Sequence, residues 1–176
     1  GASTLTVGPL TAIPVNAWSV AGSIPQQTGS ALGSLSPRMM FKVNYRNNAG
    51  TESIVTCHTI SGTLATGQVR WYELRRVGGV WTLFQQGNVQ GTDGNSRWMP
   101  AISMDGCGNI ALMYSMAGTG APAAHPSIRY TGRNSIDPVN TMTLPEATII
   151  DGATNFGGFR WGDYNAAVQD YTAVGS

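Results

Sequence analysis

Charge is scarce in this chain. Of its 176 residues, 10 are Lys or Arg and 9 are Asp or Glu, which gives 11% charged residues and a net charge of +1. Lys42 is the single lysine, and the arginines are scattered along the sequence rather than clustered. Nucleic acids and anionic lipid surfaces are bound through basic stripes or patches. We therefore expect neither of them as a partner.

Long apolar runs are missing as well. No run approaches the roughly 18 residues that a membrane-spanning helix needs. The sequence opens on Gly1, with no initiator methionine and no signal-peptide pattern. We expect no membrane span, and we interpret the chain as a processed or excised portion of a protein.

Cysteine is also rare. Cys57 and Cys107 are too few for a disulfide scaffold, and neither belongs to a CxxC or Cys/His cluster with metal-ligand spacing. We expect two buried thiols; the alternative is one bridge between neighbouring units, which would suit an exported protein. We predict no metal site and no cofactor.

Turn-forming residues are abundant by contrast. The chain has 23 Gly and 9 Pro, and it lacks the Ala/Glu/Lys/Leu-rich periodic stretches of a helical protein. Its 41% hydrophobic residues are enough for a buried core in one domain. These features predict an all-β fold.

A repeat is centred on three arginines, Arg38, Arg97 and Arg160. The spacing is 59 residues from position 38 to position 97 and 63 residues from position 97 to position 160. Gln26 precedes the first arginine by 12 residues, and Gln85 precedes the second by the same distance. A period of this length is typical of stacked β-sheet blades.

Alternating apolar residues and turn signals divide two of these repeats into four strands each. We predict strands over residues 39–46, 52–60, 69–76 and 80–86 in the first unit, and over 98–104, 109–117, 127–132 and 147–150 in the second. Residues 4–15 are predicted as the outer strand of a preceding blade, and residues 161–168 as the inner strand of a following one. The expected fold is therefore a β-propeller segment with two complete four-stranded blades and a half-blade at each end.

This prediction divides the chain into residues 1–37, 38–96, 97–159 and 160–176, which hold the first half-blade, the two full blades and the last half-blade. Two blades cannot close a ring, because closed propellers have about 4–8 blades. Either further blades belong to a longer chain of roughly 350–450 residues at about 60 residues per blade, or copies associate to complete the ring. Exposed strand edges promote aggregation, so we favour the longer chain.

Several motifs resemble one family. They are SRWMPAISMD at residues 96–105, GNIALMYS at 108–115, PSIRYTGR at 126–133 and RWGDY at 160–164. The chain is similar over residues 37–164 to large secreted bacterial proteins predicted to be β-propellers, most of them uncharacterised. This resemblance implies an extracellular or cell-surface protein and specifies no reaction. Members of that family continue after RWGDY into an Asp-Pro and an aromatic-rich strand, whereas this chain continues differently.

A more distant resemblance is to sialidase-like propellers with Asp-box turns. Ser103, Asp105 and Gly108 are similar to that turn, although the glycine spacing differs and the aromatic residue is missing. The carboxylate of such a turn accepts backbone N–H groups and holds a hairpin. We predict this structural role for Asp105 in preference to calcium ligation, since calcium takes 6–8 oxygen ligands.

The repeat arginines Arg38, Arg97 and Arg160 are the first candidate ligand-binding residues. Guanidinium groups bind carboxylates or sulfates in bidentate geometry, and sialidases use arginines from several blades in this way. The alternative is a structural role, in which each arginine ties neighbouring blades together through a carboxylate such as Asp163. We favour the structural role, because a buried charge must be paired.

Catalytic candidates are few. A glycoside hydrolase needs two positioned carboxyl groups, or a tyrosine nucleophile with an acid partner. Asp163 beside Tyr164 is the first candidate pair. Glu73 is the second catalytic candidate. His58 and His125 lack a nucleophile motif, so a triad is not favoured.

Aromatic residues supply the remaining candidates. Trp98 and Trp161 occupy equivalent positions in the repeat, which favours packing between blades. Trp18 lies in a Gly/Ser/Gln-rich stretch and is a candidate ligand contact.

Taken together, the sequence favours a non-catalytic binding or assembly module of a secreted or cell-surface bacterial protein, with carbohydrate as a candidate ligand. The expected partners are a glycan, another surface protein, the remaining blades of a longer chain, or other copies of the same chain. The main alternative is a fragment of a sialidase-like glycoside hydrolase. Arginines converging with exposed acids would support this enzyme, whereas arginines already paired with carboxylates would count against it. A second alternative is a structural subunit of an extracellular assembly.

Overall fold

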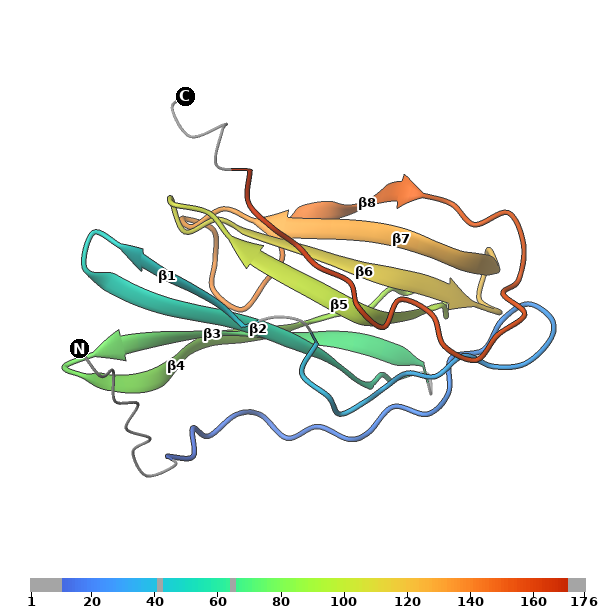
Figure 1. Cartoon of the computed structure of the whole chain (residues 1–176), viewed down its shortest axis with the longest axis horizontal. Coiled ribbons are helices and arrows are strands. Elements are labelled where there is room, and N and C mark those ends of the chain that lie inside the picture. Colours follow the sequence, from blue (N-terminus) through green and yellow to red (C-terminus); the bar gives the residue numbers. More distant parts are fainter. Residues whose placement is uncertain (1–10, 41–42, 64–65, 171–176) are drawn as a thin grey trace, which may run out of the picture.

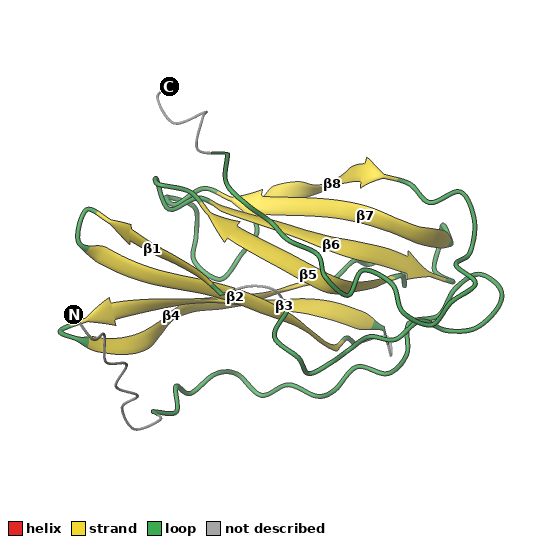
Figure 2. Cartoon of the chain, in the orientation of Figure 1, coloured by secondary structure: helices red, strands yellow, loops and turns green. Residues whose placement is uncertain are grey.

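The fold consists of two four-stranded antiparallel sheets (Figures 1 and 2). The computed structural model describes residues 11–40, 43–63 and 66–170. One sheet has the order β1 (Asn44–Asn48), β2 (Thr51–Ser61), β3 (Gly67–Val77), β4 (Val80–Val89). The other has the order β5 (Ser96–Met104), β6 (Ile110–Gly118), β7 (Ala124–Arg133), β8 (Leu144–Ile150). The described residues contain no helix, so the predicted all-β class with two four-stranded sheets is confirmed.

The strand ends differ from the predicted ends by a few residues. The largest difference is at β1, which begins at Asn44 rather than at residue 39. Met39 nevertheless forms an isolated antiparallel bridge with His58 on β2, and residues 41–42 lie outside the described part of the chain. The gaps between the predicted strands at residues 47–51 and 105–108 contain turns in the structure, at residues 49–50 and 106–107.

The arginine repeat has a structural counterpart in both sheets. The residue after Arg38 is Met39, which pairs with His58, and the residue after Arg97 is Trp98, which pairs with Ser115. The register of β5 shifts directly after Trp98. The two positions differ in pairing, because Arg97 itself pairs with Met116 within the β5–β6 ladder, whereas Arg38 directly precedes an isolated bridge.

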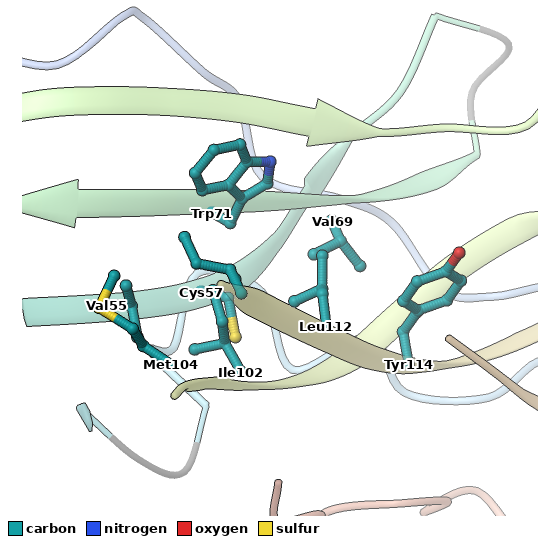
Figure 3. Packing of buried hydrophobic residues seen from close by; sticks show 9 residues of the cluster. Val55, Cys57, Val69, Trp71, Ile102, Met104, Leu112 and Tyr114 are labelled. Atoms are coloured by element: carbon teal, nitrogen blue, oxygen red, sulfur yellow. The ribbon is translucent and has the colours of Figure 1, made fainter. Parts of the chain in front are cut away.

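The two sheets pack face to face around one apolar core (Figure 3). Alternate residues of each strand point to this core, as the pleat of a β-strand requires. The first sheet contributes Val55, Cys57, Val69 and Trp71, and the second contributes Ile102, Met104, Ile110, Leu112 and Tyr114. Each such side chain stabilises the fold by about 1.5–3 kcal/mol when it is fully buried. This packing resembles that of neighbouring blades, and the two sheets do not close a ring within the described residues.

A second apolar cluster lies on the other face of the second sheet. It contains Ile24, Leu32, Met40, Trp98, Met99 and Ala117, and Trp161 packs against it. Trp98 is buried in this cluster and Trp161 packs against it, so both are packing residues, although not between the two sheets. The amide of Gly33 donates to the carbonyl of Phe159 at 2.8 Å, so segments from both ends of the chain meet here.

The two terminal strands that the sequence predicted are not formed in the described residues. Residues 11–15 have no strand pairing, and residues 4–10 of the same prediction lie outside the described part. Residues 161–168 are also not a strand. Trp161 donates to the hydroxyl of Ser115, and Asn165 donates to the carbonyl of Met99, so side chains rather than a backbone ladder attach this segment to the second sheet. A strand needs a neighbouring edge for its backbone groups, and these segments cross sheet faces instead.

The cysteines are both free. Cys57 is buried in the core between the sheets, as expected. Cys107 is exposed, contrary to the expectation of two buried thiols, because it lies at the tip of the turn between β5 and β6. Burial raises the pKa of the Cys57 thiol well above its usual range.

That turn is held by Asp105, as predicted. One carboxylate oxygen accepts the backbone N–H groups of Cys107 at 2.9 Å and of Asn109 at 2.8 Å. The other accepts the side-chain amide of Asn109 at 2.8 Å. The carboxylate is thus used for the hairpin.

Candidate functional site

A polar cavity of about 630 Å³ lies between the two sheets, where β4 ends and β8 begins. Residues 88–93 form one side and residues 140–146 form the other, and Arg97, Tyr114 and Thr131 contribute from the strands of the second sheet. The cavity therefore joins the outer strands of both blade-like sheets, which is a place where a ligand could contact two repeats at once.

The turn between β4 and β5 positions the first acid of this site. Gly94 has a φ of 76°, a left-handed conformation that glycine adopts without strain. The carboxylate of Asp93 accepts the backbone N–H of Asn95 at 3.1 Å, which closes a local Asx-type turn. Gly91 lies against the guanidinium group of Arg97, so close that an added Cβ would be 2.2 Å from Nη1. Sequence and turn geometry together bring Asp93 onto Arg97.

Arg97 is buried, and all five of its N–H donors are used. Asp93 accepts from Nη1 at 2.6 Å and from Nη2 at 3.1 Å. Glu146 accepts from Nη2 at 2.8 Å and from Nε at 3.0 Å, and the carbonyl of Asn95 accepts from Nη1 at 2.9 Å. A guanidinium group has no more than five such donors. Arg97 therefore has no N–H left for the carboxylate of a ligand.

Ion pairing shifts the pKa values of all three groups. Burial works against the charged form of Asp93, but hydrogen bonds from Arg97 and Asn95 lower its pKa to about 2. Burial likewise opposes ionisation of Glu146, and hydrogen bonds from Arg97 and Tyr114 still lower its pKa. Burial alone would lower the pKa of Arg97, and the two carboxylates raise it above its usual range. All three groups are charged at neutral pH.

Tyr114 completes the network. Its hydroxyl donates to Glu146 at 2.7 Å from the middle of β6. Burial, and then the hydrogen bond and the negative charge of Glu146, raise the pKa of this tyrosine well above its usual range. The phenol is therefore held neutral, so it can donate a hydrogen bond but is a poor nucleophile.

The cavity presents both hydrogen-bond donors and acceptors, because side-chain amides such as Asn88 and Asn140 line it beside the two carboxylates. Asp93 and Glu146 are about a quarter exposed, at 25% and 29% of their side chains. Asp93 already accepts four hydrogen bonds, from Arg97 and Asn95, and Glu146 accepts three, from Arg97 and Tyr114, so one oxygen of Glu146 keeps a free acceptor position. With Arg97 they leave a formal charge of −1 in the cavity. The hydroxyl of Thr131 already donates to the carbonyl of Leu144, which leaves its oxygen as an acceptor. Such a lining favours neutral or cationic polar ligands whose groups both donate and accept hydrogen bonds, such as hydroxyl groups.

The other two repeat arginines have different surroundings. Arg160 is exposed and pairs with Asp163 at 2.5 Å, as expected for this pair. Arg38 is exposed, and among the described residues no hydrogen-bond or ion-pair partner of its side chain is recorded. Arg97 alone is buried in a cavity. The three arginines thus do not share one environment.

The predicted catalytic residues do not form a pair in a cleft. Tyr164 is 91% exposed, whereas Asp163 is directed to Arg160. Glu73 is buried on β3, and it accepts from Arg75 at 2.7 Å and from Gln85 at 2.5 Å. These contacts give each acid a partner within the fold.

Trp18 packs on His58. The two rings are T-shaped, with centroids 4.8 Å apart, and 38% of Trp18 is exposed. His58 is fully buried beneath it and pairs with the hydroxyl of Tyr72 at 2.9 Å. Trp18 therefore covers a polar pair on the outer face of the first sheet.

Sequence reasoning missed Asp93, Tyr114 and Glu146. Asp93 lies four residues before Arg97 in a Gly-rich turn, and this spacing was a usable signal. Glu146 meets Arg97 across 49 residues, and no local pattern in the sequence indicates that contact. Tyr114 fits the alternating pattern of an ordinary strand, and this pattern gives no indication of a site.

The described residues contain no group of three or more potential metal-ligating side chains and no helix able to cross a membrane. Comparisons with protein-family models, with curated proteins and with solved structures gave no match for this chain.

Proposed function

We propose that the protein is a non-catalytic binding module that takes a glycan in the cavity between its two sheets. The observation that carries this proposal is the polar cavity of about 630 Å³ formed around Asp93, Arg97 and Glu146. Sugar hydroxyls are hydrogen-bond donors, and a cavity of this size is within the usual range for small-ligand sites.

Anionic ligands fit this site poorly. Each N–H of Arg97 is already bonded within the protein, and two carboxylates face the cavity. A ligand carboxylate or sulfate would have to displace Asp93 or Glu146 and leave it unpaired. Breaking a buried ion pair in this way costs about 3–5 kcal/mol.

Secretion or surface attachment is the second part of the proposal. It rests on the resemblance of residues 96–105, 108–115 and 126–133 to secreted bacterial propellers. Localising the native protein by fractionation of its source cells tests this part, and recovery in the cytoplasm would contradict it.

Calorimetric titration with neutral, amino and acidic sugar oligomers tests the glycan proposal. We expect dissociation constants at or below about 1 mM for at least one neutral or amino oligomer, which corresponds to about −4 kcal/mol. Glu146→Gln keeps an acceptor for Tyr114 and removes one charge, so we expect at least about tenfold weaker binding. Glu52→Gln is the matched control, because Glu52 pairs with Arg76 outside this cavity. Absence of binding to every oligomer would refute the proposal.

One observation favours a second candidate, a sialidase-like hydrolase. Tyr114 and Glu146 are 2.7 Å apart in the cavity, and a tyrosine nucleophile requires such an acid partner. The raised pKa of Tyr114 and the saturated Arg97 argue against it. Turnover of a fluorogenic sialoside that disappears in Tyr114→Phe would establish the enzyme, whereas we expect no turnover by the wild type.

A further inference from the structure

A second cavity adjoins the first. It has a volume of about 360 Å³ and is lined by residues of the turn before β5, of β7 and of the stretch after β8. Asp93 lines both cavities. Asn95 also lines the second cavity, and its backbone carbonyl accepts a hydrogen bond from Arg97, which lines the first. The two cavities therefore lie on either side of one short turn.

We propose that the two cavities form one extended site for a glycan chain that carries free amino groups. The inference rests on the proposed glycan-binding function and specifies its ligand. Two adjoining cavities accommodate consecutive sugar units better than a single small molecule, and their shared border at Asp93 places a carboxylate between the two positions.

The second cavity adds its own ion pair, Arg129 with Asp151, so the formal charge of the joined site stays at −1. Arg129 is mostly buried, and its Nη2 donates to Asp151 at 2.5 Å. Its Nη1 donates to the carbonyls of Ile128 and Ile150 at 3.3 and 3.4 Å. This second arginine is therefore also held by partners within the fold.

The carboxylate acceptors that remain accessible in the joined site are Asp151 and the one oxygen of Glu146 that accepts a single hydrogen bond. The side chain of Asp151 is 69% exposed, so most of its lone pairs face solvent. Across the joined site, Asp93, Glu146 and Asp151 carry three negative charges against two positive charges on Arg97 and Arg129. An ammonium group close to one unit of negative charge is attracted to it more strongly near a protein surface than in bulk water. An N-acetylated sugar of the same shape lacks this attraction.

The matched probes are the tetramer of glucosamine, the tetramer of N-acetylglucosamine and monomeric glucosamine, titrated calorimetrically into the whole chain at low salt. We expect the glucosamine tetramer to bind at least about tenfold more tightly than either of the other two. Raising the salt to about 0.5 M should shrink the advantage over the N-acetylated tetramer, because salt screens exposed charges.

Asp151→Asn tests the second cavity independently of the first, because Asp151 lines only the second. Asp151 is largely exposed, so this substitution should leave folding intact. It should weaken binding of the glucosamine tetramer severalfold. Binding of the monomer should not change, because we expect the monomer to occupy the first cavity. Glu52→Gln again serves as the control for a distant acid. Equal weakening of tetramer and monomer by Asp151→Asn would contradict the joined site.

The remaining outcomes distinguish this inference from the proposed function. Equal affinity for the amino and N-acetylated tetramers would overturn the inference and leave glycan binding in place. Binding of spermidine without binding of any sugar would overturn both, since it would show an affinity for cations alone.

Discussion

Gly91 shows how a single residue without a side chain permits the whole polar site. The turn before β5 lies directly on the guanidinium group of Arg97, and an added Cβ would be 2.2 to 2.4 Å from three of its atoms. That guanidinium is fixed by five hydrogen bonds and cannot move aside without breaking them. The site therefore depends on the absence of a side chain at this position.

Gly91→Ala should lower the free energy of unfolding by about 1–3 kcal/mol, the usual cost of overpacking. It should also weaken ligand binding, because Arg97 and Asp93 would be displaced together. Chemical denaturation measures the first effect. Gly22→Ala is the control, since a Cβ there meets nothing within 4 Å, and an equal loss in both variants would contradict this explanation.

The pairing of Asp93 with Arg97 predicts acid sensitivity. The pKa of Asp93 is about 2 in the folded state against an ordinary value of 3.8, so the unfolded chain takes up the proton first as the pH falls. The stabilisation is complete above about pH 4 and is lost towards pH 2, and it amounts to at most about 2 kcal/mol for this partly exposed carboxylate. Denaturation of Asp93→Asn across this range should show a flatter pH dependence than the wild type, and parallel curves would exclude the effect.

At the scale of the elements, an extended segment crosses the outer face of the first sheet. The N–H of Asn16 donates to Gln86 at 3.1 Å, and its carbonyl accepts from Arg70 at 3.3 Å. Figure 1 shows this segment running beside β3 and β4. Trp18 then places its ring on His58, so the segment is attached by one aromatic contact and a few polar ones.

Acid should destabilise the fold through His58. Burial, and then the charge of Arg70, lower its pKa from 6.5 to about 4. The unfolded chain therefore binds a proton between pH 6.5 and 4 while the folded protein does not, so stability falls as the pH falls, by roughly 3 kcal/mol in total. Denaturation monitored by tryptophan fluorescence should show the slope over this range in the wild type and not in His58→Gln, and a slope retained in the variant would assign it to another group.

The strands were predictable because alternation and turn residues are local signals. Residues 52–60 and 69–76 alternate between faces, and the turns at 47–50 and 78–79 contain glycines with positive φ. The terminal strands were mispredicted, because a strand also needs a partner edge, and residues 161–168 attach by side chains instead. Most of the site could not be predicted from the sequence, because the contact of Arg97 with Glu146 depends on how β5 and β8 are brought together.

At the scale of the whole molecule, the repeat places two similar sheets face to face, with an apolar core between them and a polar cavity at one margin. The core includes Cys57 and Trp71 from one sheet and Leu112 from the other (Figure 3). The cavity forms where the outer strands β4 and β8 leave the core, so neither unit alone contains it. We therefore place the proposed binding function at the junction between the two repeats.

The most direct test of that account is to map ligand binding by nuclear magnetic resonance on the isotope-labelled chain during titration with the glucosamine and N-acetylglucosamine tetramers. Saturable shift changes should concentrate at residues 88–97 and 140–146, with smaller changes at 151–152 for the amino tetramer. Changes confined to the outer face around Trp18, or no changes with either tetramer, would contradict a glycan site between the two sheets.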